Sequence, residues 1–291
     1  MGKSLRIRAL ALSLLVALAP LSARAVAQVE PQSQSQSQSQ SIPDLRSNAF
    51  YILDPSGSKV LAARNERTAV PIASITKLMT ALVVLEARQR MDQTIVITRD
   101  DVRDTPGSRS RLAPGARLSR SDLLHLALMS SENRAAHALC RAYPGGMPAC
   151  VRAMNRKAAS LGMKTARFVE PTGLSSSNVS SPVDLAKLVR AAAANPTVRR
   201  FSTDPEHAVS VNGRVLEFRS TNSLVKKPDW QVTVQKTGYN AEAGRCLVMQ
   251  AVIDGRDVVI ILLNSWGTLT RIGDANRIRD WLESGAGAHS G

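Results

Sequence analysis

Apolar residues recur at helical spacing through the middle of this chain of 291 residues. The stretch from Ile75 to Arg88 is almost continuously apolar, which predicts a helix that is buried on all sides. Ser181 followed by Pro182 and Asp184 is typical of a helix start, and Asn195-Pro196 predicts the end of that helix. The same spacing predicts three further helices, at 121–129, 134–141 and 151–161.

Strand patterns lie near both ends of the chain. A hairpin is predicted from Ala49 to Ala63, around the turn residues Asp54-Pro55-Ser56-Gly57. After Thr197 the pattern changes to strands, at 207–211, 215–218, 232–236, 246–253 and 258–263, with a hairpin turn at Asp254-Gly255 and a closing helix at 272–282. These patterns predict a mixed α/β (α+β) fold, in which strands from both chain ends complete one antiparallel sheet and a helical lobe, about 75–195, is inserted.

The first residues are typical of an exported protein. Lys3, Arg6 and Arg8 precede a short apolar run, and small residues follow in an Ala-x-Ala pattern. We therefore predict a cleaved signal peptide at 1–27, with an uncleaved N-terminal anchor as the alternative. A Gln-Ser alternation predicts a disordered spacer at 28–43, followed by one folded domain at 44–284 and a flexible tail at 285–291. No later run is long and apolar enough to predict a membrane span.

The charge of the chain favours anionic surroundings. Lys and Arg number 38 against 23 Asp and Glu; after removal of residues 1–27, which hold four basic and no acidic residues, 34 remain against 23, a net charge of +11. Nucleic acid is disfavoured as a partner, because aromatic residues make up only 3% and do not alternate with basic ones. Peptidoglycan carboxylates and anionic membrane surfaces suit an exported protein better, and a merely repulsive soluble surface is the alternative.

Cysteine and histidine residues predict no metal site and no cofactor. Cys140 and Cys150 flank a turn-rich segment and are predicted to form a disulfide, which an oxidising compartment allows. Cys246 lies in an apolar stretch and is predicted to be a buried free thiol. The four histidines are scattered along the chain, without the spacing of metal ligands, so we expect each of them to be structural or exposed.

Three short motifs that can carry chemistry occur in chain order: Ser-x-x-Lys, Ser-x-Asn and Lys-Thr-Gly. Ser-x-x-Lys occurs at Ser56, Ser74 and Ser223, but only Ser74 precedes a strong helix, on which Lys77 would reach the Ser74 hydroxyl. A serine at a helix start also lies among free N–H groups that stabilise a developing oxyanion. Considered alone, such a serine is more commonly a helix cap.

The other two motifs frame the predicted helical lobe. Ser131-Glu132-Asn133 stands between two predicted helices, where a polar corner can present a hydroxyl and an amide to a cleft, or simply cap the next helix. The copies at Ser176/Asn178 and Ser220/Asn222 lack this setting. Lys236-Thr237-Gly238 occurs once, at the end of the strand predicted at 232–236, where a peptide could lie alongside as an added strand while Lys and Thr bind an anion.

The order Ser74-Ile-Thr-Lys77, Ser131-Glu-Asn133, Lys236-Thr-Gly238 resembles the signature of penicillin-binding proteins and serine β-lactamases. The surrounding residues, Pro71-Ile-Ala-Ser-Ile-Thr-Lys-Leu-Met-Thr-Ala, Glu170-Pro-Thr-Gly-Leu-Ser and Lys236-Thr-Gly-Tyr-Asn-Ala-Glu-Ala-Gly-Arg, resemble the low-molecular-mass D-alanyl-D-alanine peptidases, and their single-domain endopeptidase branch most closely. The resemblance extends over 44–283. It implies a β-lactamase/transpeptidase-like fold, peptidoglycan peptide stems as substrate, β-lactams as inhibitors and a periplasmic location.

The resemblance also implies catalytic roles. Ser74 would attack the D-alanine carbonyl and carry the acyl group, Lys77 would be the general base, and Ser131 would relay protons together with Lys236. As a base, Lys77 needs a pKa lowered from about 10.4 to about 7–8. The charge of Lys236 and burial in a cleft are the expected causes.

Substrate binding is implied for the remaining motif residues. Asn133 would hydrogen-bond the peptide, and Lys236 and Thr237 would orient its carboxylate end. Gly238 would admit the substrate beside the strand, and the N–H groups of Ser74 and Tyr239 would form the oxyanion hole.

Three alternatives to the endopeptidase remain open. A β-lactamase is disfavoured, because the loop at Glu170 holds Leu174 where class A enzymes need an asparagine, so Glu170 is predicted to be structural. A non-catalytic peptidoglycan-binding protein would not need the four residues Ser74, Lys77, Ser131 and Lys236 together. A D-alanyl-D-alanine carboxypeptidase is the nearest alternative; the chain ends soon after Leu282, where familiar carboxypeptidases add a domain and an anchor, so we expect the endopeptidase.

Overall fold

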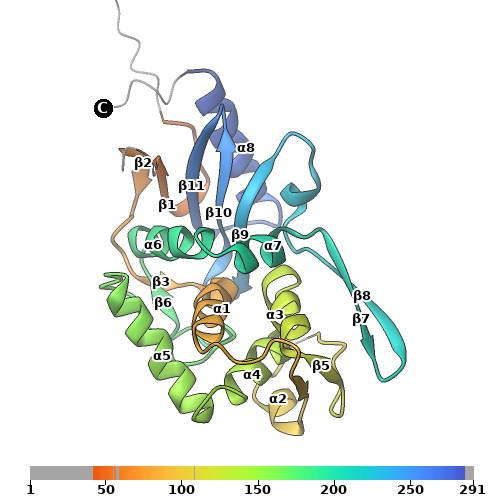
Figure 1. Ribbon diagram of the computed structural model, residues 1–291. Coiled ribbons are helices and arrows are strands. Elements are labelled where there is room, and N and C mark those ends of the chain that lie inside the picture. Colours follow the sequence, from red (N-terminus) through yellow and green to blue (C-terminus); the bar gives the residue numbers. More distant parts are fainter. Residues whose placement is uncertain (1–41, 55, 57–58, 108, 286–291) are drawn as a thin grey trace, which may run out of the picture. The chain divides into compact units, whose positions relative to one another are not determined.

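A five-stranded antiparallel sheet forms the centre of the folded region (Figure 1). The computed structural model describes residues 42–285 except positions 55, 57, 58 and 108, so the predicted signal peptide, nearly all of the predicted spacer and the end of the tail lie outside the described residues. The strand order is β2-β1-β11-β10-β9. The strands are β1 (Ser47–Asp54), β2 (Lys59–Arg64), β9 (Gln231–Asn240), β10 (Gly244–Ile253) and β11 (Arg256–Ser265). The predicted sheet with strands from both chain ends is therefore confirmed.

The sheet is covered by helices on both faces. Helix α8 (Thr270–Glu283) contacts β1, β10 and β11 on one face, and α6 (Pro182–Ala193) contacts β1, β9, β10 and β11 on the other. Consecutive side chains of a strand point to opposite faces. In β11, Val258, Ile260 and Leu262 accordingly pack with α8, whereas Val259, Ile261 and Leu263 pack with the helical lobe.

The inserted lobe is built around α1 (Thr76–Glu86), whose residues from Thr76 to Val84 are all buried. This confirms the prediction of a helix surrounded by other elements. The remaining helices of the lobe are α2 (Arg99–Arg103), α3 (Arg120–Met129), α4 (Asn133–Arg141), α5 (Gly146–Ser160) and α7 (Pro196–Thr203). Ser181 caps α6 by accepting a hydrogen bond from the Asp184 N–H, as its sequence predicts.

Several elements differ from the predictions. The expected change to strands after Thr197 is wrong over α7, because Asn195 caps this helix by accepting from the N–H groups of Thr197 and Val198, and Pro196 takes its first position. Helix α5 begins five residues before the predicted Val151. Unpredicted short elements are the helix α2, the 3₁₀ turns η1 (Ala73–Ile75) and η2 (Ser223–Lys226), and the strand pairs β3 (Val70–Pro71) with β6 (Val179–Ser180) and β4 (Thr94–Val96) with β5 (Arg117–Ser119).

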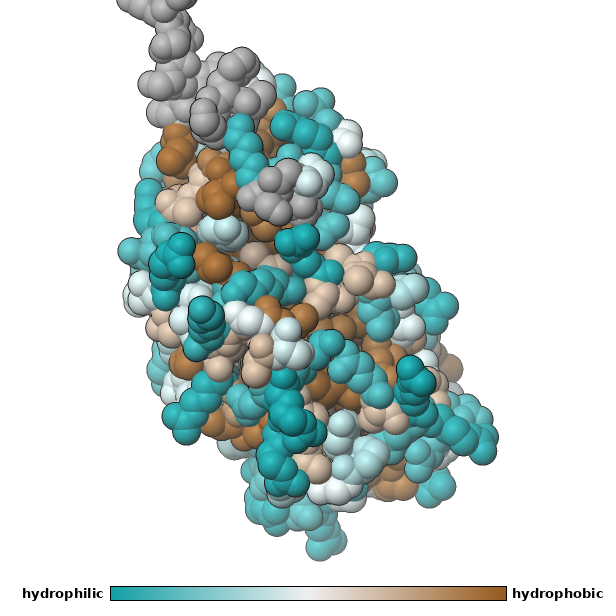
Figure 2. Space-filling view, turned by 60° about the vertical axis from the view of Figure 1, so that its left-hand side comes forward, coloured by the Kyte–Doolittle hydropathy of each residue, from teal (hydrophilic) through white to brown (hydrophobic). Residues whose placement is uncertain are grey.

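A separate hairpin, β7 (Glu206–Val211) with β8 (Arg214–Arg219), extends away from the large sheet (Figure 1). The face drawn in Figure 2 mixes hydrophilic residues with smaller apolar areas between them. Among the described residues, no helix is both long and apolar enough to cross a bilayer.

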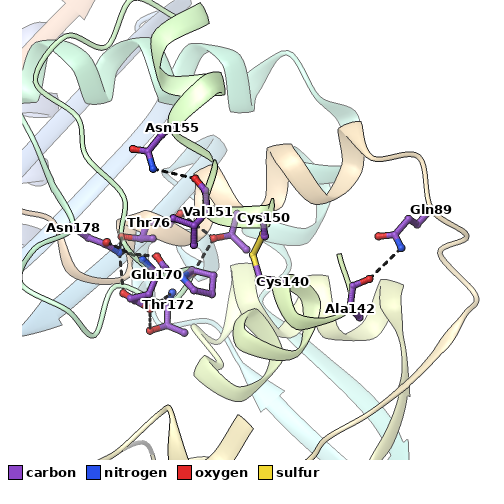
Figure 3. The surroundings of a disulfide bond; sticks show 12 residues. Thr76, Gln89, Cys140, Ala142, Cys150, Val151, Asn155, Glu170, Thr172 and Asn178 are labelled. Carbon is purple, nitrogen blue, oxygen red and sulfur yellow. Dashed lines mark hydrogen bonds between the residues drawn. A yellow bond between two sulfur atoms is a disulfide. The ribbon is translucent and has the colours of Figure 1, made fainter. Parts of the chain in front are cut away.

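The disulfide between Cys140 and Cys150 joins α4 to the adjacent α5 (Figure 3), with the two Cα atoms 5.4 Å apart. This confirms the pairing predicted from the turn-rich segment. Cys246 is a free buried thiol, as predicted, and burial raises its pKa to about 11. A raised pKa leaves Cys246 protonated at neutral pH, which makes it a poor nucleophile.

Replacing Cys140 and Cys150 together by alanine should lower the free energy of unfolding by about 2–3 kcal/mol, because the bond limits the unfolded chain. Urea unfolding of the mature protein measures this. Cys246→Ala is the control, since it removes an equally buried sulfur without breaking a cross-link. If the double variant loses no more than twice what Cys246→Ala loses, the cross-link does not stabilise the fold as expected.

Candidate active site

Ser74 and Lys77 lie at the start of the buried helix α1. Ser74 is in the turn η1, and the Lys77 Nζ lies 2.8 Å from the Ser74 Oγ, the contact predicted from their spacing. Ala73, which precedes Ser74, has a φ of 46°, in the left-handed region that costs a non-glycine residue about 1–3 kcal/mol. The other two Ser-x-x-Lys serines lie in the exposed turn after β1 and in the short turn η2.

The Lys77 amine is surrounded by three oxygen atoms. Besides Ser74 Oγ, it lies 2.6 Å from the Asn133 Oδ1 and 2.6 Å from the main-chain oxygen of Thr172. The residue is only 1% exposed. The polar atoms that water would supply elsewhere are thus supplied here by three separate segments of the chain.

Burial lowers the pKa of Lys77 to about 7, although the charges of Glu170 and Glu132 oppose the shift. A neutral amine has two N–H donors and one lone pair. The two donors match the oxygens of Asn133 and Thr172, which can only accept, and the lone pair is left for the hydroxyl proton of Ser74. The geometry therefore suits proton transfer from Ser74 to Lys77.

Asn133 begins α4, directly after the corner that separates it from α3. Within this corner Ser131 has a φ of 61°, and the Glu132 carboxylate caps α4 by accepting from the Arg134 N–H at 3.2 Å. The Ser131 hydroxyl makes no hydrogen bond to any described residue. The corner predicted from the sequence is present, while the relay role of Ser131 stays a prediction.

Lys236, Thr237 and Gly238 lie in β9, an edge strand of the sheet. The prediction that the strand ends at Lys236 is wrong, because pairing with β10 continues to Asn240.

The Lys236 Nζ is fully buried and donates to the Thr237 main-chain oxygen at 2.9 Å. Burial lowers the pKa of Lys236, and the charges of Lys77 and Arg271 lower it further. Burial is the largest cause of the shift at both lysines, and of the two causes expected at Lys77 only burial lowers its pKa; the charge of Lys236 is not among the causes at Lys77.

Gly238 allows β9 to approach Ser74. A Cβ atom at this position would lie 3.0 Å from the Ile72 main-chain oxygen and 3.2 Å from the Ser74 nitrogen. The next residue, Tyr239, is 60% exposed, and its ring lies under the Arg245 guanidinium at 4.5 Å. The strand edge therefore runs directly past Ser74.

The loop that supplies the Thr172 oxygen is organised by Glu170 (Figure 3). The Glu170 carboxylate accepts hydrogen bonds from the N–H groups of Thr172, Gly173 and Ser175, from the Thr172 hydroxyl and from the Asn178 amide. The prediction that Glu170 is structural is confirmed. Sequence reasoning missed that this loop holds Lys77; the signal was present in Glu170-Pro-Thr-Gly, a compact turn with an acidic start.

Gly173 allows this loop to pack closely against η1. A Cβ atom at Gly173, whose φ is +82°, would lie 1.9 Å from the Ala73 main-chain oxygen and 2.7 Å from the Ser74 nitrogen. No side chain fits there. The loop and β9 thus approach Ser74 through glycines, Gly173 and Gly238.

The part of the chain that the structure describes holds no cluster of side chains suited to a metal ion. Its histidines lie close to aspartates, His125 with Asp204 at 2.9 Å, His137 with Asp101 at 2.7 Å and His207 with Asp122 at 3.2 Å. His289 lies outside the described residues.

Comparison with known proteins gives a consistent result. The profile of the D-alanyl-D-alanine carboxypeptidase family of peptidases matches residues 34–267. A D-alanyl-D-alanine endopeptidase of Pseudomonas aeruginosa is 46% identical over 83% of this chain and 79% of its own length, and one of Escherichia coli K12 is 43% identical over 84% and 80%.

Solved structures agree in fold. A D-alanyl-D-alanine carboxypeptidase of Mycobacterium tuberculosis superposes with a TM-score of 0.77 at 28% identity, covering 85% of this chain and 95% of its own. The Streptomyces K15 DD-transpeptidase superposes with a TM-score of 0.77 at 25% identity, covering 83% and 98%.

Gly173→Ala should slow acylation of Ser74 by about 10²-fold, the scale seen when reacting groups are displaced by about 1 Å. Gly115→Ala is the matched control: its φ is +88°, so it carries the same backbone strain, but its Cβ would meet nothing within 4 Å. Labelling by a fluorescent penicillin gives the rate. Equal losses in the two variants would mean that strain alone, and not the contact with Ala73, explains the effect.

The rate of penicillin acylation should rise with pH through about 7, because only the unprotonated Lys77 amine can accept the Ser74 proton. Glu132→Gln removes a negative charge that raises the pKa of Lys77, so the rising limb should move to lower pH. Stopped-flow rates between about pH 5 and 9 measure the shift. The exposed Glu217→Gln is the control. A limb that stays in place, or moves to higher pH, in Glu132→Gln would contradict the electrostatic account.

Proposed function

The chain belongs to the D-alanyl-D-alanine carboxypeptidase family of serine peptidases, and from this membership we propose that it is a D-alanyl-D-alanine endopeptidase that hydrolyses peptidoglycan cross-links through an acyl-enzyme on Ser74. The observation that carries the proposal is the 2.8 Å contact between Ser74 Oγ and the fully buried Lys77 amine. The relatives at 46% and 43% identity bear the name endopeptidase, whereas a D-alanyl-D-alanine carboxypeptidase of Mycobacterium tuberculosis is 32% identical.

The hydrogen bonds around Lys77 support an acylation step in which its free lone pair accepts the Ser74 proton. The Ser74 proton passes to Lys77 Nζ while Ser74 Oγ bonds to the D-alanyl carbonyl carbon. The C–N bond then breaks, and the leaving amine takes up a proton through Lys77 or the Ser131 hydroxyl. Water attacks the ester in the second half while Lys77 accepts one of its protons. That proton then passes to Ser74 Oγ as the ester C–O bond breaks, which restores Ser74 and releases the acid.

Substrate binding is assigned to the strand edge. The peptide would lie beside β9 as an added strand, with Asn133 donating its amide to the peptide and Lys236 and Thr237 receiving the carboxylate next to the bond that is cut. The N–H groups of Ser74 and Tyr239 would bind the carbonyl oxygen. This is supported by Gly238, which brings the strand against the Ser74 nitrogen.

The β-lactamase alternative finds no support in the loop at 170–178. A deacylating glutamate must have a free carboxylate oxygen to activate water, whereas both oxygens of Glu170 accept hydrogen bonds from the loop. We therefore expect the penicilloyl-enzyme to be long-lived.

We place the protein in the periplasm, after removal of residues 1–27. The sequence pattern of these residues, the disulfide and the cell-wall substrate of the proposal all support an oxidising compartment outside the cytoplasm.

Penicillin should label Ser74, and not Ser56 or Ser223. Intact mass and peptide mapping of the treated protein identify the labelled residue, with Ser74→Ala as the control. A label on another serine, or no label on the folded native protein, would contradict the assignment.

Purified cross-linked sacculi should be cut to monomers, with D-alanine release from pentapeptides as the lesser activity. Lys236→Ala should reduce turnover at least ~10²-fold, the scale of losing one electrostatic stabiliser of the transition state. Chromatography of the digests decides. If dimers persist while pentapeptides lose their terminal D-alanine, the protein is a carboxypeptidase.

A further inference from the structure

A basic pocket lies next to the candidate active site. It has a volume of about 380 Å³ and is lined by four cationic residues, Arg219, Lys226, Arg245 and Arg271, together with residues that carry hydroxyl or apolar side chains. None of its lining residues is acidic. Four elements meet here: the end of β8, the turn η2, the start of β10 and the start of α8.

The four cations of this basic pocket are not neutralised. Within the described ranges, none of them forms an ion pair with a carboxylate. Burial lowers the pKa of Arg271, and the charge of Arg245 lowers it further. The Arg271 Nε is buried without a hydrogen-bond partner. Like charges held together without a counter-charge are costly, and a bound anion would relieve the cost.

The basic pocket is joined to the Lys236-Thr237-Gly238 segment by direct contacts. The Thr221 hydroxyl, which lines the pocket, lies 2.5 Å from the Thr237 hydroxyl. Arg271 donates to the Gly238 main-chain oxygen at 3.4 Å, and Arg245 stacks on Tyr239. The pocket thus continues from the place where the proposed function puts the carboxylate next to the bond that is cut.

Exposed apolar side chains border the same region. Tyr239 is 60% exposed, Leu269, which lines the pocket, is 71% exposed, and Trp266 is 73% exposed. Trp266 follows Ser265, which pairs with Arg245 across β10 and β11. Aromatic and apolar residues beside a cluster of arginines are typical of a surface that binds a peptide, because both residue classes are enriched in binding interfaces.

We propose that the basic pocket binds a second carboxylate of the leaving peptide strand, beyond the carboxylate held by Lys236 and Thr237. This inference rests on the proposed endopeptidase function and extends it to substrate choice. A free D-alanine leaving group has only the carboxylate assigned to Lys236 and Thr237 and offers no second one to the pocket, whereas the leaving strand of a cross-link continues and carries further acidic groups. The pocket would therefore favour cross-links over terminal D-alanine.

Two cross-linked peptide dimers test the proposal. In one, the carboxylates of the leaving strand are free; in the other, all of them except the one adjoining the cleaved bond are amides. Calorimetric titration into the mature Ser74→Ala protein measures binding without turnover. We expect the free-acid dimer to bind at least about tenfold more tightly than the amide, a difference of about 1.4 kcal/mol.

Arg219→Gln with Lys226→Gln, added to the Ser74→Ala protein, should abolish this preference and leave binding of the amide dimer unchanged. The matched control is Arg214→Gln with Lys227→Gln, which removes the same charge from the same strand and the residue after the same turn, but outside the pocket lining. The control should keep the preference. Urea unfolding confirms that both double variants are folded.

Equal binding of the two dimers to the Ser74→Ala protein would overturn the proposal, as would equal effects of the pocket and control variants. Failure of the proposed function looks different: the native protein would leave the free-acid dimer uncut while penicillin still acylates Ser74. If selective binding persists in that case, the pocket recognises an anionic peptide, and the endopeptidase assignment alone is wrong.

Discussion

The burial of the Lys77 amine is the constraint on which the rest of this site depends. Lowering its pKa from 10.5 to about 7 corresponds to about 5 kcal/mol of unfavourable charging, at about 1.4 kcal/mol for each pKa unit. Since the pKa is lower in the folded state, the unfolded chain binds more protons between these two values, and this cost falls as the pH rises from about 7 to 10.5. At neutral pH the fold therefore holds Lys77 near the point at which it can act as a base.

Three segments far apart in the sequence must meet to bury this amine. Helix α1 carries it, the first residue of α4 is Asn133, and the loop organised by Glu170 supplies the Thr172 oxygen. The two glycines beside Ser74, Gly173 and Gly238, are needed for the same physical reason. At either position a methyl group would contact the main chain of η1. The glycines allow the loop and the edge strand to close around the nucleophile.

Local patterns predicted much of this arrangement. The continuous apolar stretch at α1 predicted its burial, and the spacing of Ser74 and Lys77 predicted their contact, because helix geometry is local. The helix α7 was missed, since Asn195-Pro196 ends one helix and caps the next, and a single reading assigns it only one of these roles. The extent of β9 was missed because pairing with β10 sets the end of the strand.

The role of the Thr172 oxygen could not be predicted in the same way. A main-chain oxygen carries no sequence signature, and its position depends on five hydrogen bonds to Glu170 and on the space left by Gly173. The same holds for the basic pocket, whose four cations come from four elements between residues 219 and 271. Both features arise from tertiary contacts, which periodicity does not describe.

The most direct test of the account is the pKa of Lys77 itself. Nuclear magnetic resonance titration of the native protein with labelled lysine, assigned by a Lys77→Arg variant, follows the amine without any substrate. The Lys77 amine is expected to titrate with a midpoint at about pH 7, because burial lowers its pKa. A Lys77 signal that stays protonated to about pH 10, the ordinary range of lysine, would contradict it.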